Sequence, residues 1–329
     1  MPRLNNTELQ VSNICFGGNV FGWTADEQQS FALLNRFTEL GGNFIDTADV
    51  YSSWKEGNQG GESETIIGNW VSSKGNRDQV VIATKVALLE TRKGLSASNI
   101  ACACDDSLRR LKTDYIDIYY AHTDDLETPL EETLEAFNKL VVAGKVRYIA
   151  ASNYTFDRLG EALATSEANS FAKYIALQNR YSLVAREPYE SDGTKSVKSY
   201  GVSGLPYSTL GSGFLSGKYQ PGVAVSSARA EGVSNNYAND ENFALLARLT
   251  EVANKHEVST TAVALEWLRN QPGVTVPIAS GRTIEQLNAL MQEVKLTTEE
   301  LSFIAGYARL LSIREMISGA SGLVVGLNL

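Results

Sequence analysis

Short apolar runs alternate with longer amphipathic stretches along the chain. Eight runs are rich in β-branched and aromatic residues and are flanked by Gly, Asn or Asp, which predicts strands. They are NICFGG (13–18), NFIDTA (43–48), VVIATKV (80–86), YIDIYYAH (115–122), VRYIAAS (146–152), YIALQNR (174–180), GVSGLPYSTL (201–210) and GVTVPIAS (273–280). The stretches between them have helical periodicity. In TPLEETLEAFNKLVVAGKV, for example, we expect Thr128 to cap the helix and Gly144 to end it.

Alternating strands and helices predict an α/β fold. The early strands follow one another every ~30 to 36 residues, which is the size of a βαβ unit, and eight such units fit a (β/α)8 TIM barrel. The last step is about twice as long, so we expect a long loop over residues 220–240 and an additional helix there. The alternative is an open doubly wound sheet. However, FGGNVFGW after the first strand is not the expected Gly-rich phosphate turn.

No linker or shift of composition divides the chain. Residues 1–329 are therefore expected to form a single domain, with an irregular tail over 318–329. A hydrophobic content of 43% is ordinary for a globular protein, and the net charge of −9 argues against nucleic acid or an anionic membrane as a partner. Cys15, Cys102 and Cys104 form neither a disulfide framework nor a zinc pattern, and two histidines exclude a histidine-rich metal site.

The chain starts MPRLNNTELQ, without a charged and then apolar leader, and no apolar run approaches the ~20 residues that span a bilayer. These features predict a cytoplasmic protein that does not act at a membrane.

Polar residues gather where the second, third and fourth strands end. Asp46 and Tyr51 follow the second strand, Lys85 ends the third and His122 ends the fourth. Each has a structural explanation by itself, such as capping a loop or filling a core. Together they would meet at one rim of a barrel, where chemistry is usually found. Asp46 would hold the Lys85 ammonium in place, and that charge is expected to lower the pKa of the Tyr51 phenol. Such a set can protonate a carbonyl oxygen.

The chain resembles the aldo-keto reductase superfamily over most of its length. The motifs that carry the resemblance are NFIDTADVYS, GGESETIIGNW, VVIATKV, SLRRLKTDYIDIYYAH, GKVRYIAASNYT, PYSTLGSGFLSGKY and ASGRTIEQL. The resemblance implies an N-terminal β-hairpin and extra helices and loops at the C-terminal side. It also implies an oxidoreductase that reduces an aldehyde or ketone by hydride transfer from NADPH. In that reaction Tyr51 is the general acid, Lys85 and Asp46 tune it, and His122 orients the carbonyl. Asp49 matches no position of this tetrad, and we interpret it as a loop-shaping acid.

The resemblance also implies cofactor contacts on the last four strands and the loops that follow them. It assigns Ser152, Asn153 and Gln178 to the nicotinamide carboxamide, Tyr207 to ring stacking, Ser208, Leu210, Ser212 and Lys218 to the pyrophosphate, and Ser280, Arg282 and Gln286 to the phosphate and adenine end. Arginine suits a 2′-phosphate, so NADPH or NADP+ is expected rather than NADH. Many relatives have asparagine where this chain has Leu290. The 220–240 segment, with Arg229, either folds over the pyrophosphate or is a disordered excursion.

Trp23 and Trp54 follow the first two strands and are candidates for an apolar wall of the substrate pocket. The substrate is then a small-molecule carbonyl compound whose identity the sequence leaves open, as it does the oligomeric state. Two other functions stay open. One is an NADP(H)-binding regulatory or redox-sensing subunit that resembles the potassium-channel β subunits, and the other is alcohol oxidation as the physiological direction.

Overall fold

The computed structural model describes residues 1–187, 189–223 and 225–306. The chain falls into two compact units. The barrel unit consists of Met1–Thr209 and Leu268–Met291, and the helical unit consists of Leu210–Trp267 and the chain from Gln292 onward. The single domain predicted for residues 1–329 stays a prediction. The predicted irregular tail over 318–329 lies outside the described residues.

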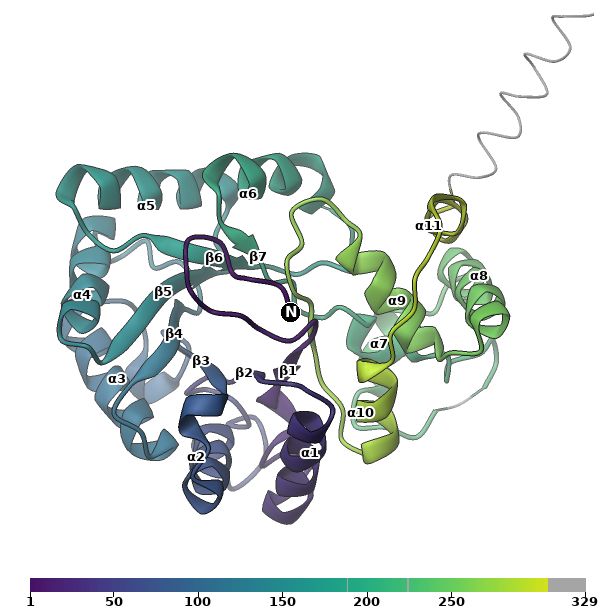
Figure 1. The fold of residues 1–329 in the computed structure, drawn as a ribbon, viewed down its shortest axis with the longest axis horizontal. Helices are drawn as coiled ribbons and strands as arrows, with labels where there is room; N and C mark the ends of the chain where they lie inside the picture. Colours follow the sequence, from purple (N-terminus) through teal and green to yellow (C-terminus); the bar gives the residue numbers. More distant parts are fainter. Residues whose placement is uncertain (188, 224, 307–329) are drawn as a thin grey trace, which may run out of the picture. The chain divides into compact units, whose positions relative to one another are not determined.

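Eight parallel strands form one sheet in the barrel unit (Figure 1). They are β1 (Cys15–Gly17), β2 (Phe44–Asp46), β3 (Val81–Val86), β4 (Ile116–Ala121), β5 (Val146–Ser152), β6 (Tyr174–Gln178), β7 (Ser203–Gly204) and β8 (Ile278–Ala279). Each strand lies inside one of the predicted runs. The order in the sheet is β7-β6-β5-β4-β3-β2-β1-β8, so each of the first seven strands pairs with its neighbour in sequence.

The sheet closes between β7 and the segment that leads into β8. The backbone N–H of Thr275 donates to the Gly204 carbonyl at 2.8 Å, and that of Ile278 donates to the Pro206 carbonyl at 2.8 Å. On its other side β8 pairs with β1, with Cys15 opposite Ile278. The prediction of a (β/α)8 TIM barrel is confirmed.

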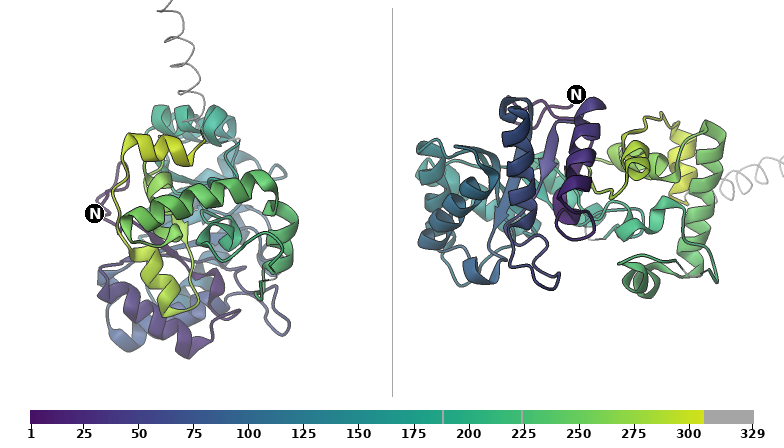
Figure 2. Two further views of the ribbon diagram at one scale, coloured as in Figure 1. Left: turned by 90° about the vertical axis from the view of Figure 1, so that its right-hand side faces the viewer. Right: turned by 90° about the horizontal axis from the view of Figure 1, so that it is seen from below.

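Helices cover the outer face of the sheet (Figure 1). They are α1 (Glu27–Glu39), α2 (Glu62–Lys74), α3 (Ala97–Leu111), α4 (Leu130–Val142), α5 (Phe156–Asn169), α6 (Thr194–Tyr200) and α10 (Ile284–Met291), and α1 and α2 lie side by side in Figure 2. Short turns of helix supplement them: η1 (Gly18–Val20), η2 (Arg77–Gln79), η3 (Glu90–Arg92) and the π-helical η4 (Tyr189–Gly193). The predicted cap of α4 was wrong by one residue. Pro129 occupies the N-cap position, and the Thr128 hydroxyl instead donates to Asp125 at 2.8 Å.

The N-terminal segment forms the expected β-hairpin. Arg3 pairs antiparallel with Gln10, and the Leu4 N–H donates to the Leu9 carbonyl at 3.1 Å. Leu4, Leu9 and Val11 pack on the apolar residues inside the barrel. The hairpin therefore completes the core of the barrel.

The helical unit contains helices after the seventh strand and one, α11, after the eighth. They are η5 (Gly211–Ser216), α7 (Ala230–Tyr237), α8 (Asp240–His256), α9 (Thr260–Arg269, whose end belongs to the barrel unit) and α11 (Thr298–Ile304). The 220–240 segment is not simply a long loop, because α7 lies inside it. Glu300 of α11 accepts from Lys255 at 2.6 Å and pairs with His256 at 2.9 Å, which holds α11 on α8 (Figure 2). In the described ranges, no helix has the length and apolar character to cross a membrane.

Candidate active site

A layer of polar side chains lies at the C-terminal end of the barrel interior. Side chains alternate between the two faces of a strand, so a residue two positions after an interior apolar residue also faces inward. Phe44, Ala83, Tyr120, Ala150, Ala176, Leu205 and Ile278 belong to the apolar interior. The residues two positions after each of these, in the same order, are Asp46, Lys85, His122, Ser152, Gln178, Tyr207 and Ser280. Seven sequence-predicted site residues thus share one layer.

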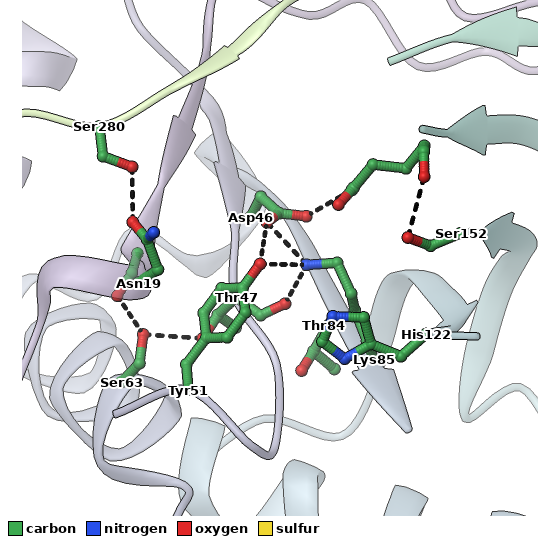
Figure 3. A network of polar contacts seen from close by, with 12 residues as sticks. Asn19, Asp46, Thr47, Tyr51, Ser63, Thr84, Lys85, His122, Ser152 and Ser280 are labelled. Carbon is green, nitrogen blue, oxygen red and sulfur yellow. Dashed lines mark hydrogen bonds and ion pairs between the residues drawn. The ribbon is translucent and has the colours of Figure 1, made fainter. Parts of the chain in front are cut away.

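Lys85 is the centre of this layer. Its side chain is fully buried, and its Nζ donates to Asp46 Oδ2 at 2.7 Å, to the Thr47 carbonyl at 2.7 Å and to the Tyr51 hydroxyl at 2.9 Å (Figure 3). The three ammonium hydrogens therefore have one acceptor each. A buried charge is tolerated only when it is paired and hydrogen-bonded, and this lysine meets both conditions.

Asp46 connects the lysine to the strands on the other side of the barrel. Its Oδ2 accepts from Lys85 and from the Tyr51 hydroxyl, the latter at 3.1 Å, and its Oδ1 accepts from Gln178 Nε2 at 2.9 Å (Figure 3). The Ser152 hydroxyl in turn donates to the Gln178 carbonyl at 2.9 Å. The structure thus brings five predicted site residues of β2, β3, β5, β6 and the β2–α2 loop into one hydrogen-bonded network.

Burial sets the protonation of the phenol and the imidazole. It raises the pKa of Tyr51 well above its usual value, and the Asp46 carboxylate adds to the shift. The expected lowering of this pKa was wrong in direction, because desolvation outweighs the nearby ammonium. Burial and Lys85 also lower the pKa of His122 well below its ordinary range. At neutral pH the site therefore holds a protonated phenol and a neutral imidazole, whose rings are 6.0 Å apart.

Several of the predicted cofactor residues contact one another in the barrel unit. The Tyr207 hydroxyl donates to Asn153 Oδ1 at 2.7 Å, and Asn153 Nδ2 donates to the His122 carbonyl at 2.9 Å. Asn153 and Ser208 both have positive φ, 56° and 54°, which turns the chain sharply after β5 and after β7. These contacts place predicted cofactor residues directly beside His122.

The β8–α10 loop carries the predicted phosphate residues. Ser280 Oγ donates to Asn19 Oδ1 at 2.6 Å (Figure 3), and the Arg282 N–H donates to Gln286 Oε1 at 2.9 Å. Gln286 therefore folds back over the loop before α10. Leu290 is buried on α10.

The remaining predicted cofactor residues belong to the helical unit. Leu210 precedes η5, Ser212 lies inside it with φ 56°, and Lys218 follows it. The Lys218 ammonium lies 5.3 Å from the centre of the Tyr219 ring. Arg229 directly precedes α7.

The two predicted pocket tryptophans contact each other. The rings of Trp23 and Trp54 meet edge to face at 5.6 Å, and Trp54 lies 6.2 Å from Tyr51. Trp54 is 49% exposed, which leaves an aromatic surface beside the Tyr51 ring open to solvent.

Three residues near the site were missed or misread from the sequence. The Thr47 carbonyl binds Lys85, and a backbone acceptor leaves no signal in the sequence. Asn19 holds Ser280, and its position just after the first strand was the available signal. Asp49 was interpreted as a loop-shaping acid, but neither of its carboxyl oxygens has a hydrogen-bond partner in the described part of the chain. Among the described residues no group of His, Cys, Asp or Glu is arranged to hold a metal ion.

Comparison with known proteins gives the relationships of this chain. Residues 13–308 match the model of the Aldo/keto reductase family. The chain is 33% identical over 319 residues to norsolorinic acid reductase stcV of Emericella nidulans, covering 89% of this chain and 77% of that protein. It is also 33% identical to the uncharacterized oxidoreductase YrpG of Bacillus subtilis, covering 90% of this chain and 91% of YrpG. Protein tas of Escherichia coli is 30% identical over 326 residues, with 91% and 94% covered.

Proposed function

This chain belongs to the aldo/keto reductase family of oxidoreductases, and on that premise we propose that it reduces an aldehyde or ketone to the alcohol with NADPH. The observation that carries the proposal is the bonding of Lys85 to both Tyr51 and Asp46 at the C-terminal end of the barrel interior. A phenol held by a buried ammonium is suited to donating a proton and then carrying the negative charge that remains.

Tyr51 is the general acid in this proposal. Its O–H now donates to Asp46, and it turns to a substrate carbonyl oxygen when one is bound. The phenolate left after proton transfer lies 2.9 Å from the Lys85 ammonium, which stabilises it. The neutral His122 imidazole helps to orient the carbonyl by hydrogen bonding, since it can donate from one ring nitrogen and accept at the other.

The proposed cofactor site uses the polar ends of β5 to β8. The amide and hydroxyl groups of Ser152, Asn153 and Gln178 match the donors and acceptors of a carboxamide, and bound NADPH would supply the hydride. Gln178 already donates its Nε2 hydrogen to Asp46, so its Oε1 is the atom that would accept from the carboxamide. Tyr207 would stack on the ring. Arg282, just before the N-terminus of α10, would bind the 2′-phosphate, which favours NADPH over NADH.

The proposed pyrophosphate contacts are Ser208 in the barrel unit and Leu210, Ser212 and Lys218 in the helical unit. Ser280 and Gln286 would contact the phosphate and adenine end. Trp23 and Trp54 would form an apolar wall for the carbonyl substrate, because Trp54 lies 6.2 Å from the Tyr51 ring and packs edge to face on Trp23. A cytoplasmic location stays a prediction from the sequence.

The test follows NADPH oxidation by absorbance with an activated aromatic aldehyde, for wild type, Tyr51→Phe and Arg282→Ala. We expect Tyr51→Phe to lose at least about a hundredfold in kcat, the usual contribution of a general acid, while cofactor binding is retained. Arg282→Ala should raise KM for NADPH and leave KM for NADH nearly unchanged. A Tyr51→Phe enzyme with full activity would refute the assigned acid.

The same experiment decides between the open alternatives. Wild type that binds NADPH but reduces no member of a broad carbonyl panel would favour the regulatory subunit. Faster NADP+ reduction with the matching alcohols than carbonyl reduction, at cellular cofactor ratios, would favour oxidation as the physiological direction. The relatives' names include a reductase, which supports carbonyl reduction.

A further inference from the structure

A second group of buried polar side chains lies behind the proposed site, between the sheet and helices α2 and α3. Lys85 faces the barrel interior, so Thr84 beside it faces outward. Its hydroxyl donates to Glu64 Oε1 of α2 at 2.5 Å, and Arg110 Nε of α3 donates to Glu64 Oε2 at 2.6 Å. Glu64 is fully buried and both of its oxygens are occupied. Tyr119, opposite Thr84 in the strand pairing, is also buried.

Asp49 lies next to this group and, unlike Glu64, its carboxyl has no hydrogen-bond partner among the described residues. The residue is fully buried, and neither carboxyl oxygen makes a hydrogen bond to the described chain. The backbone N–H of Val50 lies close enough to favour the charged form but makes no hydrogen bond. The Tyr119 hydroxyl likewise lacks a hydrogen-bond partner among the described residues. Burial raises the pKa of Tyr119, and the charge of Asp49 adds to this shift. Two unpartnered polar groups are thus buried around the same cluster.

The charges that face Asp49 come from three elements. Glu64 of α2 is a like charge, while Arg110 of α3 and Lys85 of β3 are opposite charges. Both cations are already committed, Arg110 to Glu64 and Lys85 to Asp46. Burial, and then Glu64, raise the pKa of Asp49 to about 8, so the carboxyl is protonated at neutral pH. A charged carboxylate in this place would be both desolvated and unpaired.

Asp49 is joined by its backbone to the groups proposed for proton transfer. Its N–H donates to the carbonyl of Lys85 at 3.3 Å, and Tyr51 follows two residues later in a turn closed by Tyr51 N–H to the Ala48 carbonyl at 3.2 Å. The Gly60–Gly61 turn packs closely against the backbone of Asp49. A Cβ at Gly60 would lie 2.9 Å from the Asp49 carbonyl oxygen. The tight packing leaves a carboxylate no route to solvent unless the loop moves.

We propose that Asp49 is a positioning residue that must stay a neutral carboxylic acid, and that its ionisation at alkaline pH displaces the loop carrying Tyr51. The inference rests on the proposed function for the role of Tyr51 but not for the loop movement. Tyr51 does not itself explain a loss near pH 8, since its own pKa lies well above 10. Asparagine has the shape of the protonated acid and never ionises, so Asp49→Asn separates the charge from the packing.

The experiment measures the pH profile of kcat for wild type and Asp49→Asn, with exposed Asp78→Asn as the matched control. One pH unit above its midpoint, a single ionisation should reduce wild-type kcat about tenfold. Asp49→Asn should stay within about twofold of its neutral value there, and Asp78→Asn should follow wild type. Equal alkaline midpoints for wild type and Asp49→Asn would overturn the proposal, as would a large loss of kcat in Asp49→Asn at pH 7 with the fold intact.

Hydrogen exchange provides a readout that needs no turnover. The peptide covering residues 47–58 should exchange faster at pH 9.5 than at pH 7 in wild type, after correction for the intrinsic rate, with helix α4 as the internal reference. Asp49→Asn should not show this increase. If wild type proves inactive on all carbonyls, the proposed function fails but this measurement still decides the loop movement. An unchanged loop in wild type at pH 9.5 would reject it.

Discussion

Removing both charges of the buried Asp46–Lys85 pair should cost far less stability than removing either charge alone. Both side chains are almost fully buried, with exposures of 2% and 0%, and their atoms are 2.7 Å apart. Lys85→Met leaves a buried carboxylate with two neutral donors, and Asp46→Asn leaves a buried ammonium with two neutral acceptors. Each single change is expected to cost ~3–5 kcal/mol, because it strands a charge away from water.

The double variant replaces two charges by two neutral groups of similar shape. It should therefore lie within about 2 kcal/mol of wild type, which makes the coupling energy of the cycle at least about 4 kcal/mol. The assay is urea unfolding at pH 7, followed by tryptophan fluorescence and circular dichroism. A parallel cycle on the exposed pair Glu135–Lys139 should give a coupling below ~1 kcal/mol. If the two losses at Asp46 and Lys85 simply add, the account of a mutually dependent buried pair is wrong.

Three further changes test other parts of the barrel unit. Asp49→Asn should stabilise the protein relative to wild type, and increasingly so from pH 5 to 8, in urea titrations. The native Asp49 carboxyl keeps its proton up to about pH 8, whereas the unfolded chain loses that proton near pH 3.8, so the free energy of unfolding of wild type falls by about 1.4 kcal/mol per pH unit, or ~4 kcal/mol between pH 5 and 8. Parallel plots of unfolding free energy against pH for the two proteins would contradict this. Asp117→Ala should cost ~3–5 kcal/mol in the same assay with kcat unchanged, because two arginines and a backbone N–H donate to this buried carboxylate. Gly61→Ala should lower the free energy of unfolding by more than the ~1–2 kcal/mol that a positive φ costs a residue with a side chain, because its Cβ would lie 2.4 Å from Cδ of Arg110. A melting temperature equal to that of wild type would show that the loop adjusts without loss of stability.

The sequence was sufficient to predict the strands and the barrel. Each strand core is a run of β-branched and aromatic residues, and the spacing of the runs leaves room for one helix between neighbours. Polar residues at the ends of such runs identified Asp46, Lys85 and His122, because parallel strands in a barrel bring those ends to one rim. The boundaries were less predictable. The 220–240 segment has no long apolar stripe, and α7 inside it buries only Val233 and Tyr237.

The pKa shifts and the hydrogen-bond partners of the site residues could not be predicted from the sequence. Burial, and then the Asp46 carboxylate, raise the pKa of Tyr51, and that burial is known only from the fold. Asp49 looks like any acid in a loop, and that its carboxyl has no hydrogen-bond partner within residues 1–187, 189–223 and 225–306 is a property of the packing around it. Contacts made by backbone atoms, such as the Thr47 carbonyl with Lys85, are independent of residue type and so invisible in a sequence.

The bonding around Asp46 bears on the proton donation that we propose for Tyr51. Tyr51 donates to Asp46 Oδ2 at 3.1 Å, longer than the 2.7 Å contact between that oxygen and Lys85. When the O–H turns away, Oδ2 still has Lys85 and Oδ1 still has Gln178, so no buried carboxylate oxygen is left without a donor. Losing one hydrogen bond to a charged group costs about 1.5–3 kcal/mol, and a buried carboxylate oxygen left with no donor at all would cost more. The network therefore keeps the phenol protonated and oriented, and in the proposed reaction it would limit the cost of turning the O–H to a carbonyl oxygen.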